Sequence, residues 1–165
     1  MKQFYVCKSK IEGFGVNAGE DIKTGEFITR FKGKPRFLLV TNKKESLSHP
    51  NWIGIAKNQW IDPEKPQKFI NHSCNPNAGI KGKVSIISLR DIKEGEEITF
   101  DYSIIEGDFM WQMKMKCNCG EKNCRGIIRS VQFLPEEQFR KYMPNIPTYF
   151  KNLYLKNQGR KLRHA

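Results

Sequence analysis

The sequence predicts a mainly β fold with a short α-helical appendage at the C-terminal end. Three observations lead to this expectation. Short apolar or β-branched runs recur up to about residue 102, and turns rich in Gly, Pro and Asn separate them. A turn followed by a strand-forming run occurs twice, in residues 21–28 and 91–98. After residue 129 the apolar side chains recur at a helical spacing instead.

The expected strands are short and follow one another closely. They cover residues 4–7, 13–16, 27–31, 52–55, 59–62, 84–89 and 97–102. Residues 32–50 are mixed, with Pro35 and Pro50 as breakers. We interpret the repeated turn as two uses of one local structure rather than as a duplication, because nothing else in the chain repeats.

The C-terminal piece predicts helices. Pro135–Met143 has a proline in its first turn and acidic residues near its start, both typical of a helix N-terminus. Pro144 would end this helix, and Thr148–Leu155 is expected to form a second short one. Lys156–Ala165 is basic and contains glycine, so we expect it to be frayed.

The bulk composition indicates one soluble domain with an appendage. The chain has 165 residues, of which 38% are hydrophobic and 28% are charged. No apolar run approaches the roughly 20 residues that a membrane helix needs. The N-terminal residues lack the apolar region of a signal peptide. We therefore expect an intracellular monomer or weak dimer, in the cytoplasm or nucleoid of a microbe or in the nucleus of a eukaryote.

The basic charge is concentrated in the last third of the chain. Residues 1–110 hold 17 Lys and Arg against 14 Asp and Glu, whereas residues 111–165 hold 12 against 3. A basic region of this kind is typical of contact with nucleic acid or another anionic surface. A solvated tail explains the same pattern, and the sequence leaves both interpretations open.

Three polar stretches are expected to meet in space at the active site. They are Phe69–Asn77, Gly95–Tyr102 and Cys117–Cys124. The last contains three cysteines, and five cysteines in an intracellular chain favour a metal site over disulfides. Structural zinc needs four ligands, so Cys74 or Cys7 would complete the set, with Cys74 preferred because it lies on a turn in the polar stretch. Free thiols are the alternative.

These stretches resemble the signature motifs of SET-domain protein-lysine methyltransferases with a zinc-binding post-SET segment. The resemblance covers about residues 4–128 and also includes an early glycine motif. It divides the chain into a SET core (1–112), a post-SET segment (113–128) and a basic, partly helical extension (129–165). The matching motifs are Gly13-Phe-Gly15, Asn71-His-Ser-Cys-x-Pro-Asn77, Gly95-Glu-Glu-Ile-Thr-Phe-Asp-Tyr102 and Cys117-x-Cys-x4-Cys-Arg-Gly126.

The resemblance implies a fold and a cofactor. The family's fold is a β-clip-like set of small curved β-sheets in which the segment with Asn71 is threaded through a loop as a pseudoknot. The cofactor is S-adenosylmethionine, and Lys68 stands where many members have Arg. By motif position, the cofactor-binding residues would be Glu12, Gly13, Phe14, Gly15, Asn71, His72 and Asn118. The zinc ligands would be Cys74, Cys117, Cys119 and Cys124.

The resemblance also implies a lysine channel with a catalytic tyrosine. Tyr102 matches the active-site tyrosine, and Phe100 matches the position that controls how many methyl groups fit. Trp60 and Trp111 are further candidate walls of the channel. Because phenylalanine lacks the hydroxyl that would crowd a methylated amine, we expect di- or trimethylation.

The acidic stretch 91–108 is expected either to receive a basic protein, such as a histone-like or ribosomal tail, or to be a solvated turn. The basic C-terminal region would then contact nucleic acid. One alternative function is a non-catalytic, zinc-containing SET-like module that binds chromatin or nucleic acid. Another is a bare zinc ribbon that binds nucleic acid, but the cysteine cluster covers little of the chain.

Overall fold

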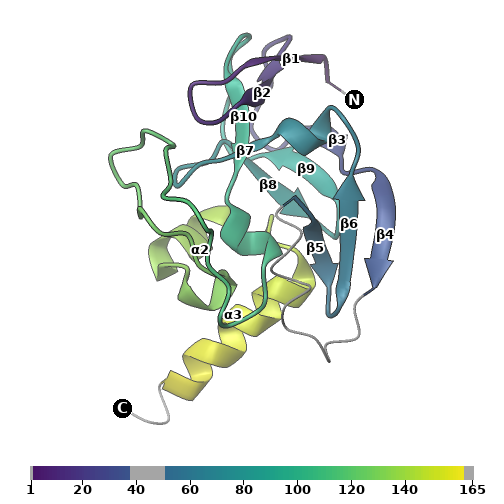
Figure 1. Cartoon of the computed structure of the whole chain (residues 1–165). Helices are drawn as coiled ribbons and strands as arrows, with labels where there is room; N and C mark the ends of the chain where they lie inside the picture. The colour runs from purple at the N-terminus through teal and green to yellow at the C-terminus, as the bar shows by residue number, and fades with distance from the viewer. Residues whose placement is uncertain (1, 38–50, 162–165) are drawn as a thin grey trace.

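The computed structural model describes residues 2–37 and 51–161, in which the strands form three small sheets (Figure 1). The first sheet has the order β1-β2-β10-β7, with β7 and β10 parallel and its other pairs antiparallel. This sheet joins segments that are far apart in the sequence. Its strands are β1 (Phe4–Lys8), β2 (Phe14–Ala18), β7 (Asn71–His72) and β10 (Glu97–Phe100).

The other two sheets each have three antiparallel strands, in the orders β3-β9-β8 and β4-β6-β5. Together with two helices they confirm the prediction of a mainly β fold with an α-helical appendage. The strands are β3 (Phe27–Arg30), β4 (Gly33–Phe37), β5 (Ile53–Ala56), β6 (Gln59–Pro63), β8 (Ala78–Lys81) and β9 (Ser85–Ser88).

Two details of the predicted strands are wrong. Pro35 does not break the chain but lies inside β4, an edge strand, where a proline needs no partner for its missing N–H. The other predicted breaker, Pro50, lies outside the described residues. The strand expected over residues 97–102 ends at Phe100, and a 3₁₀ helix, η2 (Tyr102–Ile105), follows directly. Tyr102 therefore begins a helical turn.

The repeated turns lie against each other. Backbone hydrogen bonds run both ways between Ile22 and Ile92, at 2.8 and 2.9 Å. Ion pairs also join the two copies reciprocally: Lys23 with Asp91 at 3.0 Å, and Lys93 with Asp21 at 2.8 Å. The two turns thus pair with each other as one structural unit. This pairing holds β10, which follows the second turn, against the segment that contains the first turn.

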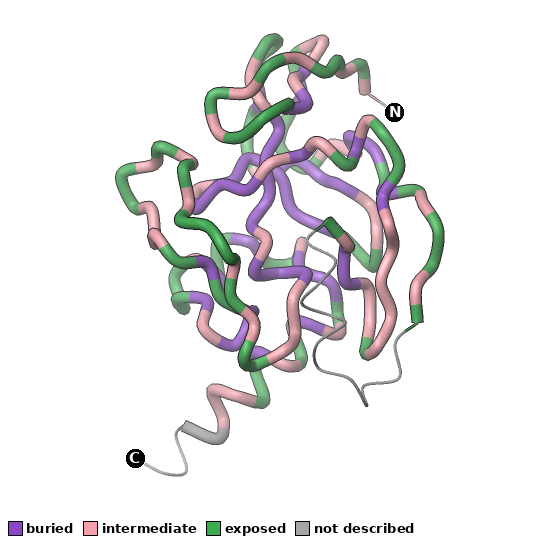
Figure 2. The backbone as a smooth tube through the Cα atoms, in the orientation of Figure 1, coloured by how far each residue is buried: buried purple, intermediate pink, exposed green. Residues whose placement is uncertain are grey.

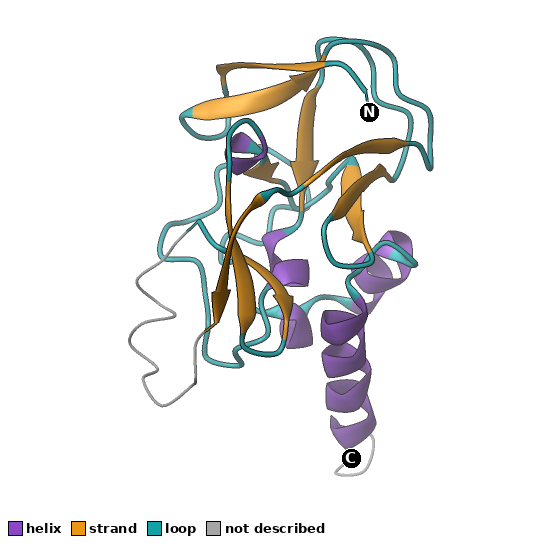
Figure 3. Ribbon diagram, turned by 90° about the vertical axis from the view of Figure 1, so that its right-hand side faces the viewer, coloured by secondary structure: helices purple, strands orange, loops and turns teal. Residues whose placement is uncertain are grey.

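The C-terminal extension packs into the main core. It contains η3 (Val131–Phe133), α2 (Glu136–Tyr142) and α3 (Thr148–Lys161). The rings of Phe139 and Tyr154 stack at 3.8 Å and join the same hydrophobic cluster as the sheets. The prediction that residues from Lys156 onward are frayed is wrong up to Lys161, because α3 continues to that residue and projects from the sheets (Figure 3).

The core lies where the three sheets meet, and buried backbone gathers there (Figure 2). Isoleucine dominates it, and burying each such side chain stabilises the fold by roughly 1.5–3 kcal/mol. Among the described residues, no helix is long and apolar enough to span a membrane. The fully buried isoleucines of the core that lie in strands are Ile28, Ile80, Ile86 and Ile98.

Candidate active site

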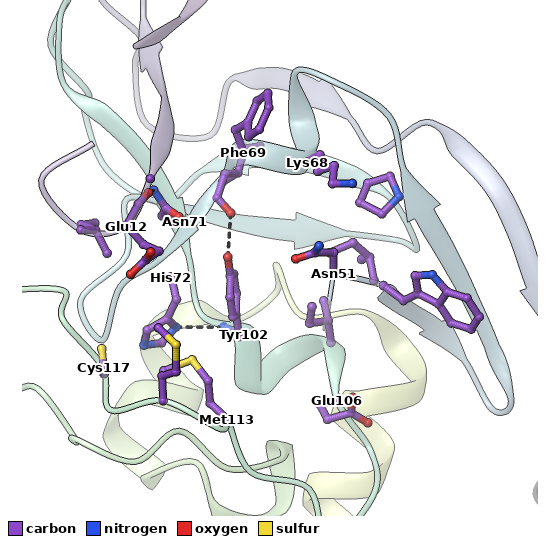
Figure 4. A pocket seen from close by; sticks show the side chains of 18 of the residues that line it. Glu12, Asn51, Lys68, Phe69, Asn71, His72, Tyr102, Glu106, Met113 and Cys117 are labelled. Carbon is purple, nitrogen blue, oxygen red and sulfur yellow. Dashed lines mark hydrogen bonds between the residues drawn. The ribbon is translucent and has the colours of Figure 1, made fainter. Parts of the chain in front are cut away.

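A cleft of about 640 Å³ lies between the first and third sheets and the post-SET segment predicted from the sequence (Figure 4). Four separate stretches, 11–14, 51–53, 67–72 and 111–118, form most of its wall. The wall is completed by Trp60, Pro63, Tyr102, Ile105 and Glu106. The fold therefore brings the predicted polar stretches together at one cavity.

Most of the predicted cofactor-binding and channel residues line this cleft. Gly15 and Phe100 do not, and both lie just behind its wall. The lining residues that the sequence did not single out individually include Trp52, Glu106 and Met113, which lie outside the recognised motifs. Of these, Glu106 belongs to the acidic stretch 91–108 that was expected to receive a basic protein. The predicted residues that do line the cleft are Glu12, Gly13, Phe14, Asn71, His72, Asn118, Tyr102, Trp60 and Trp111.

Asn71 ties β7 to the glycine loop. Its side-chain amide lies within hydrogen-bond distance of the carbonyl oxygens of Glu12 and Phe14, at 3.2 and 3.0 Å. The same nitrogen lies 2.8 Å from Oε1 of Glu97. A Cβ on Gly15 would lie only 2.4 Å from that carboxylate oxygen, so a glycine is needed for this approach. Gly15 thus supports the cleft from behind.

His72 is held in one tautomer by its neighbours. Its Nδ1 accepts a hydrogen bond from the backbone N–H of Tyr102 at 3.1 Å, so the proton lies on Nε2. That Nε2 is 3.3 Å from Sγ of Cys74. Burial lowers the pKa of His72 to about 4, with the charge of Asp101 opposing the shift and that of Arg125 adding to it. The imidazole is therefore neutral at neutral pH.

Tyr102 stands in the middle of the cleft (Figure 4). Its hydroxyl donates to the carbonyl oxygen of Ile70 at 3.0 Å. Its ring lies 5.1 Å from the ring of Phe100 and 5.3 Å from that of His72. Burial raises the pKa of Tyr102, and the negative charge of Glu97 raises it further, so the side chain remains a phenol. Because the hydroxyl proton points at the carbonyl oxygen of Ile70, the hydroxyl oxygen of Tyr102 can still accept a hydrogen bond from another donor.

Phe100 is a core residue that supports Tyr102. It is 1% exposed, and its ring meets the edge of Phe31 at a centroid distance of 5.6 Å. Its other aromatic contact is with Tyr102. Phe100 therefore influences the shape of the cleft through the ring in front of it.

Four cysteines gather beside the cleft and could hold a metal ion. Their sulfur atoms all lie within 4.8 Å of one another, and the pair Cys74–Cys117 is 4.0 Å apart. A tetrahedral zinc ion with Zn–S bonds of about 2.3 Å requires sulfur atoms about 3.8 Å apart, so the cluster fits. The cluster consists of Cys74, Cys117, Cys119 and Cys124, and Cys7 is not a member. The thiol of Cys7 instead contacts Asn17 at 3.1 Å.

Besides His72, Tyr102 and Cys117, the ionisable groups of the cleft are two acids and three lysines. The acids are Glu12 and Glu106, and the lysines are Lys68, Lys114 and Lys116. Burial raises the pKa of Glu106 to about 7, and the nearby charge of Asp108 adds to the shift against the backbone hydrogen bonds from Asp108 and Gly107.

Comparison with known proteins gives one family and many curated relatives. The family model described as "SET domain" matches residues 13–103. A Candida glabrata protein named "Histone-lysine N-methyltransferase, H3 lysine-36 specific" is 34% identical over 139 residues, which is 74% of this chain and 19% of that protein. The Saccharomyces cerevisiae protein of the same name is 32% identical over 139 residues, again 74% of this chain and 19% of that protein. The chain thus spans about a fifth of these relatives.

Solved structures show the same fold. The structure of KRYPTONITE in complex with mCHH DNA, an H3(1-15) peptide and SAH has a TM-score of 0.60 at 23% identity. The match covers 78% of this chain and 30% of that one. A humanized mutant of the Chaetomium thermophilum Polycomb Repressive Complex 2 has a TM-score of 0.55 at 24% identity, over 63% of this chain and 15% of that one. The β-sheets described above therefore form a known fold.

Proposed function

The chain belongs to the SET domain family, and from this premise we propose that it is an S-adenosylmethionine-dependent protein-lysine N-methyltransferase. The observation that carries the proposal is the convergence of the glycine loop, Asn71, His72 and Tyr102 on one cleft. The curated relatives are named histone-lysine N-methyltransferases, which supports the same activity. Further support comes from the neutral imidazole of His72, which suits cofactor binding, and from the protonated phenol of Tyr102, which suits positioning of the lysine amine.

The cofactor would occupy the part of the cleft next to the glycine loop. S-adenosylmethionine supplies a methyl group bonded to a positively charged sulfur. The polar side chains of Asn71 and His72 would hold it, together with the backbone of residues 12–14 and Asn118 on the facing segment. The cleft of about 640 Å³ lies within the range of about 300–1,000 Å³ typical of small-molecule sites.

Tyr102 would position the lysine amine. A free lysine has a pKa of about 10.4, so its ammonium must lose a proton before nitrogen can attack. Removal of the amine from water and the positive charge on the cofactor's sulfur both disfavour the charged form. The hydroxyl oxygen of Tyr102 can accept an N–H of the neutral amine, because its own proton is donated to Ile70. Tyr102 would thus orient the amine without acting as a base.

The product would be di- or trimethyl-lysine. Phe100 packs against Tyr102 and carries no hydroxyl that could hold a water in the lysine channel. More room at the amine would then remain for methyl groups. This part of the proposal rests on the family position of Phe100 and on its contact with the catalytic ring.

One structural zinc ion would be held by the four cysteines described above. Such an ion would connect Cys74, directly after β7, to the segment that carries Asn118. Because the cluster includes a residue of the core, a separate zinc ribbon is a weaker alternative than a zinc-stabilised SET enzyme.

The substrate would be a basic, lysine-bearing protein. The relatives' names specify histone H3 for those proteins, and histone-like proteins are the first candidates for this one. Contact of the basic C-terminal extension with nucleic acid would bring such a substrate near. Deleting residues 156–165 should then weaken DNA binding and lower its salt dependence. Unchanged binding would remove this role. The protein would act inside the cell as a monomer or weak dimer.

The experiment is calorimetry with S-adenosylmethionine on zinc-loaded protein, followed by a methylation assay with labelled cofactor and core histones. We expect binding and label on lysine. Tyr102→Phe should keep cofactor binding and lose most of kcat. Absence of cofactor binding would overturn the proposal and leave the non-catalytic binding module as the better explanation.

A further inference from the structure

The acidic run 91–108 offers one carboxylate to the cleft. Of its seven acidic residues, only Glu106 lines the cavity. Glu97 accepts hydrogen bonds from Ser9 and Asn71 behind the wall. Three other members are in ion pairs: Asp91 with Lys23, Glu96 with Arg90, and Asp101 with Arg125. Of the seven acidic side chains in this run, Glu106 is therefore the one that a substrate in the cleft could contact.

Glu106 is held firmly at the end of η2. Its carbonyl oxygen accepts from the backbone N–H of Val131 at 3.0 Å, and the carbonyl of Gly107 accepts from the amide of Gln132 at 2.9 Å. Its Oε1 accepts from the N–H groups of Gly107 and Asp108 at 3.0 and 3.3 Å. Within the described ranges, no hydrogen bond reaches its Oε2. One carboxylate oxygen is fixed and the other remains for a ligand.

Indole rings line the same cleft as this carboxylate. In the third sheet Trp60 pairs with Gly54, and a Cβ on Gly54 would lie 2.1 Å from the carbonyl oxygen of Ile105. The face of the sheet that carries Trp60 is therefore directed at the end of η2, next to Glu106. Trp111 lines the same cavity. Trp52 lines it as well, but its ring already faces the guanidinium of Arg36 at 5.4 Å.

We infer that Glu106, Trp60 and Trp111 form a subsite for a cationic side chain of the substrate, two residues away from the lysine that is methylated. This inference rests on the proposed function. A carboxylate accepts charge-assisted hydrogen bonds from a guanidinium or an ammonium. Indole faces attract the same cations, with tryptophan the strongest of the aromatic rings. The ligand class is therefore an arginine or lysine side chain of a peptide.

The spacing between Tyr102 and Glu106 suits an extended peptide. Glu106 lies below Tyr102 in the view of Figure 4, and η2 connects them. Four residues of 3₁₀ helix rise by about 8 Å. In an extended chain, side chains two residues apart point to the same face and are about 6.7 Å apart. A peptide whose lysine reaches Tyr102 thus presents its second neighbour near Glu106.

The surroundings of Glu106 favour a cation as the partner. Burial disfavours its negative charge, and the neighbouring charge of Asp108 adds to the raised pKa. The other titratable neighbour is Tyr149 of α3, whose own pKa is raised by burial and by Glu106. A positive side chain would relieve both effects, whereas a neutral or acidic one would not.

The test compares arginine with citrulline, its neutral isostere, in peptides. Each synthetic peptide carries one lysine in a Gly, Ala and Ser background, with arginine or citrulline placed at successive nearby positions. The enzyme variant is Glu106→Gln, whose amide oxygen can still accept from Gly107 and Asp108. The control is Asp108→Asn, which removes a charge from the same segment but outside the cleft. S-adenosylmethionine affinity and Tm show that each variant is folded.

We expect the native enzyme to prefer arginine at one of the two positions that lie two residues from the lysine, by about tenfold in kcat/KM, mainly through KM. Glu106→Gln should bring this ratio close to one, while Asp108→Asn should keep it. Equal rates for arginine and citrulline at both positions, or a preference that survives Glu106→Gln, would overturn the subsite alone. No methylation of any lysine peptide, with cofactor bound, would overturn the proposed function and the subsite together.

Discussion

The guanidinium of Arg125 lies 2.6 Å from Oδ2 of Asp101, in an ion pair that is nearly closed to solvent. Asp101 is 0% exposed and the Arg125 side chain is 15% exposed. Asp101 directly precedes the proposed catalytic Tyr102, and Arg125 directly follows Cys124. The hydroxyl of Tyr142 in α2 donates to the same carboxylate oxygen at 3.1 Å. The pair therefore connects the cleft, the cysteine cluster and the C-terminal extension.

Breaking this pair from one side should be costly. Arg125→Met leaves the Asp101 carboxylate buried without its cation, and we expect the free energy of unfolding to fall by about 3–5 kcal/mol. Adding Asp101→Asn removes the stranded charge, so the double variant should recover part of this loss. Urea unfolding of the zinc-loaded variants measures both effects.

Arg140 provides a matched control. It also lies 2.6 Å from a carboxylate, that of Glu136, but both side chains are largely exposed. Arg140→Met should therefore change the free energy of unfolding by less than about 1 kcal/mol. Similar losses for the two methionine variants would show that burial of the Asp101 pair is not what makes it important.

The sequence was most informative where chemistry dictates residue types. Tyr102 and Cys74 stand in motifs whose order is specific, so their meeting at one site could be predicted. Glu106 could not be identified in this way, because six other acids surround it in the sequence and only the fold shows which of the seven lines the cleft. Gly54 likewise carries no local sign that it lies against Ile105.

The fold too was predictable where local sequence patterns decide it, and not where tertiary contacts do. Strands with β-branched residues between turns were found, whereas β4 was missed because Pro35 is acceptable only at a sheet edge, which is a tertiary property. The length of α3 was underestimated for a related reason. Packing of its first turns, through Phe150 and Tyr154, supports a helix whose own composition is polar and basic.

Removal of one cluster ligand should weaken both metal and cofactor binding. Cys74→Ser takes away a ligand that joins the core to the segment carrying Asn118, so that wall of the cleft should loosen. We expect loss of stoichiometric zinc and at least about tenfold weaker S-adenosylmethionine binding. Elemental analysis and calorimetry measure the two quantities.

Cys7→Ser is the control for this prediction. Cys7 lies in β1 outside the cluster, where its thiol contacts Asn17. Zinc content and cofactor affinity should therefore stay at the native values. If Cys74→Ser loses zinc but keeps full cofactor affinity, the coupling between the two sites is absent.

A hydroxyl at position 100 should change the product. Phe100→Tyr adds a polar group to a buried ring in contact with Phe31 and Tyr102, and this group can hold a water where a methylated amine needs space. We expect the product to shift towards monomethyl-lysine, with cofactor affinity retained. Mass spectrometry of the methylated protein gives the distribution. A native enzyme that makes only monomethyl-lysine would contradict the prediction before any variant is tested.

The buried carboxyl of Glu106 should make stability depend on pH in a defined window. Its pKa is about 7 in the folded protein against 4.5 as the ordinary value, so between these pH values the folded state keeps a proton that the unfolded state has released. Stability therefore falls as pH rises from about 4.5 to 7, by up to about 3 kcal/mol from this group, and levels off above.

Glu106→Gln isolates this effect from the other acids that titrate in the same range. The variant carries no titrating group at this position. The difference in free energy of unfolding between the variant and the native protein should therefore be small near pH 4 and should grow in favour of the variant to its full value above pH 7. Urea unfolding of both proteins from pH 4 to 8 gives the difference curve. Asp108→Asn should produce a smaller rise, because it removes only the charge of the Asp108 side chain and leaves the burial of Glu106 and its backbone hydrogen bonds in place. A flat difference curve for Glu106→Gln would mean that the carboxyl is well solvated, and a solvated carboxyl would bind a peptide cation only weakly.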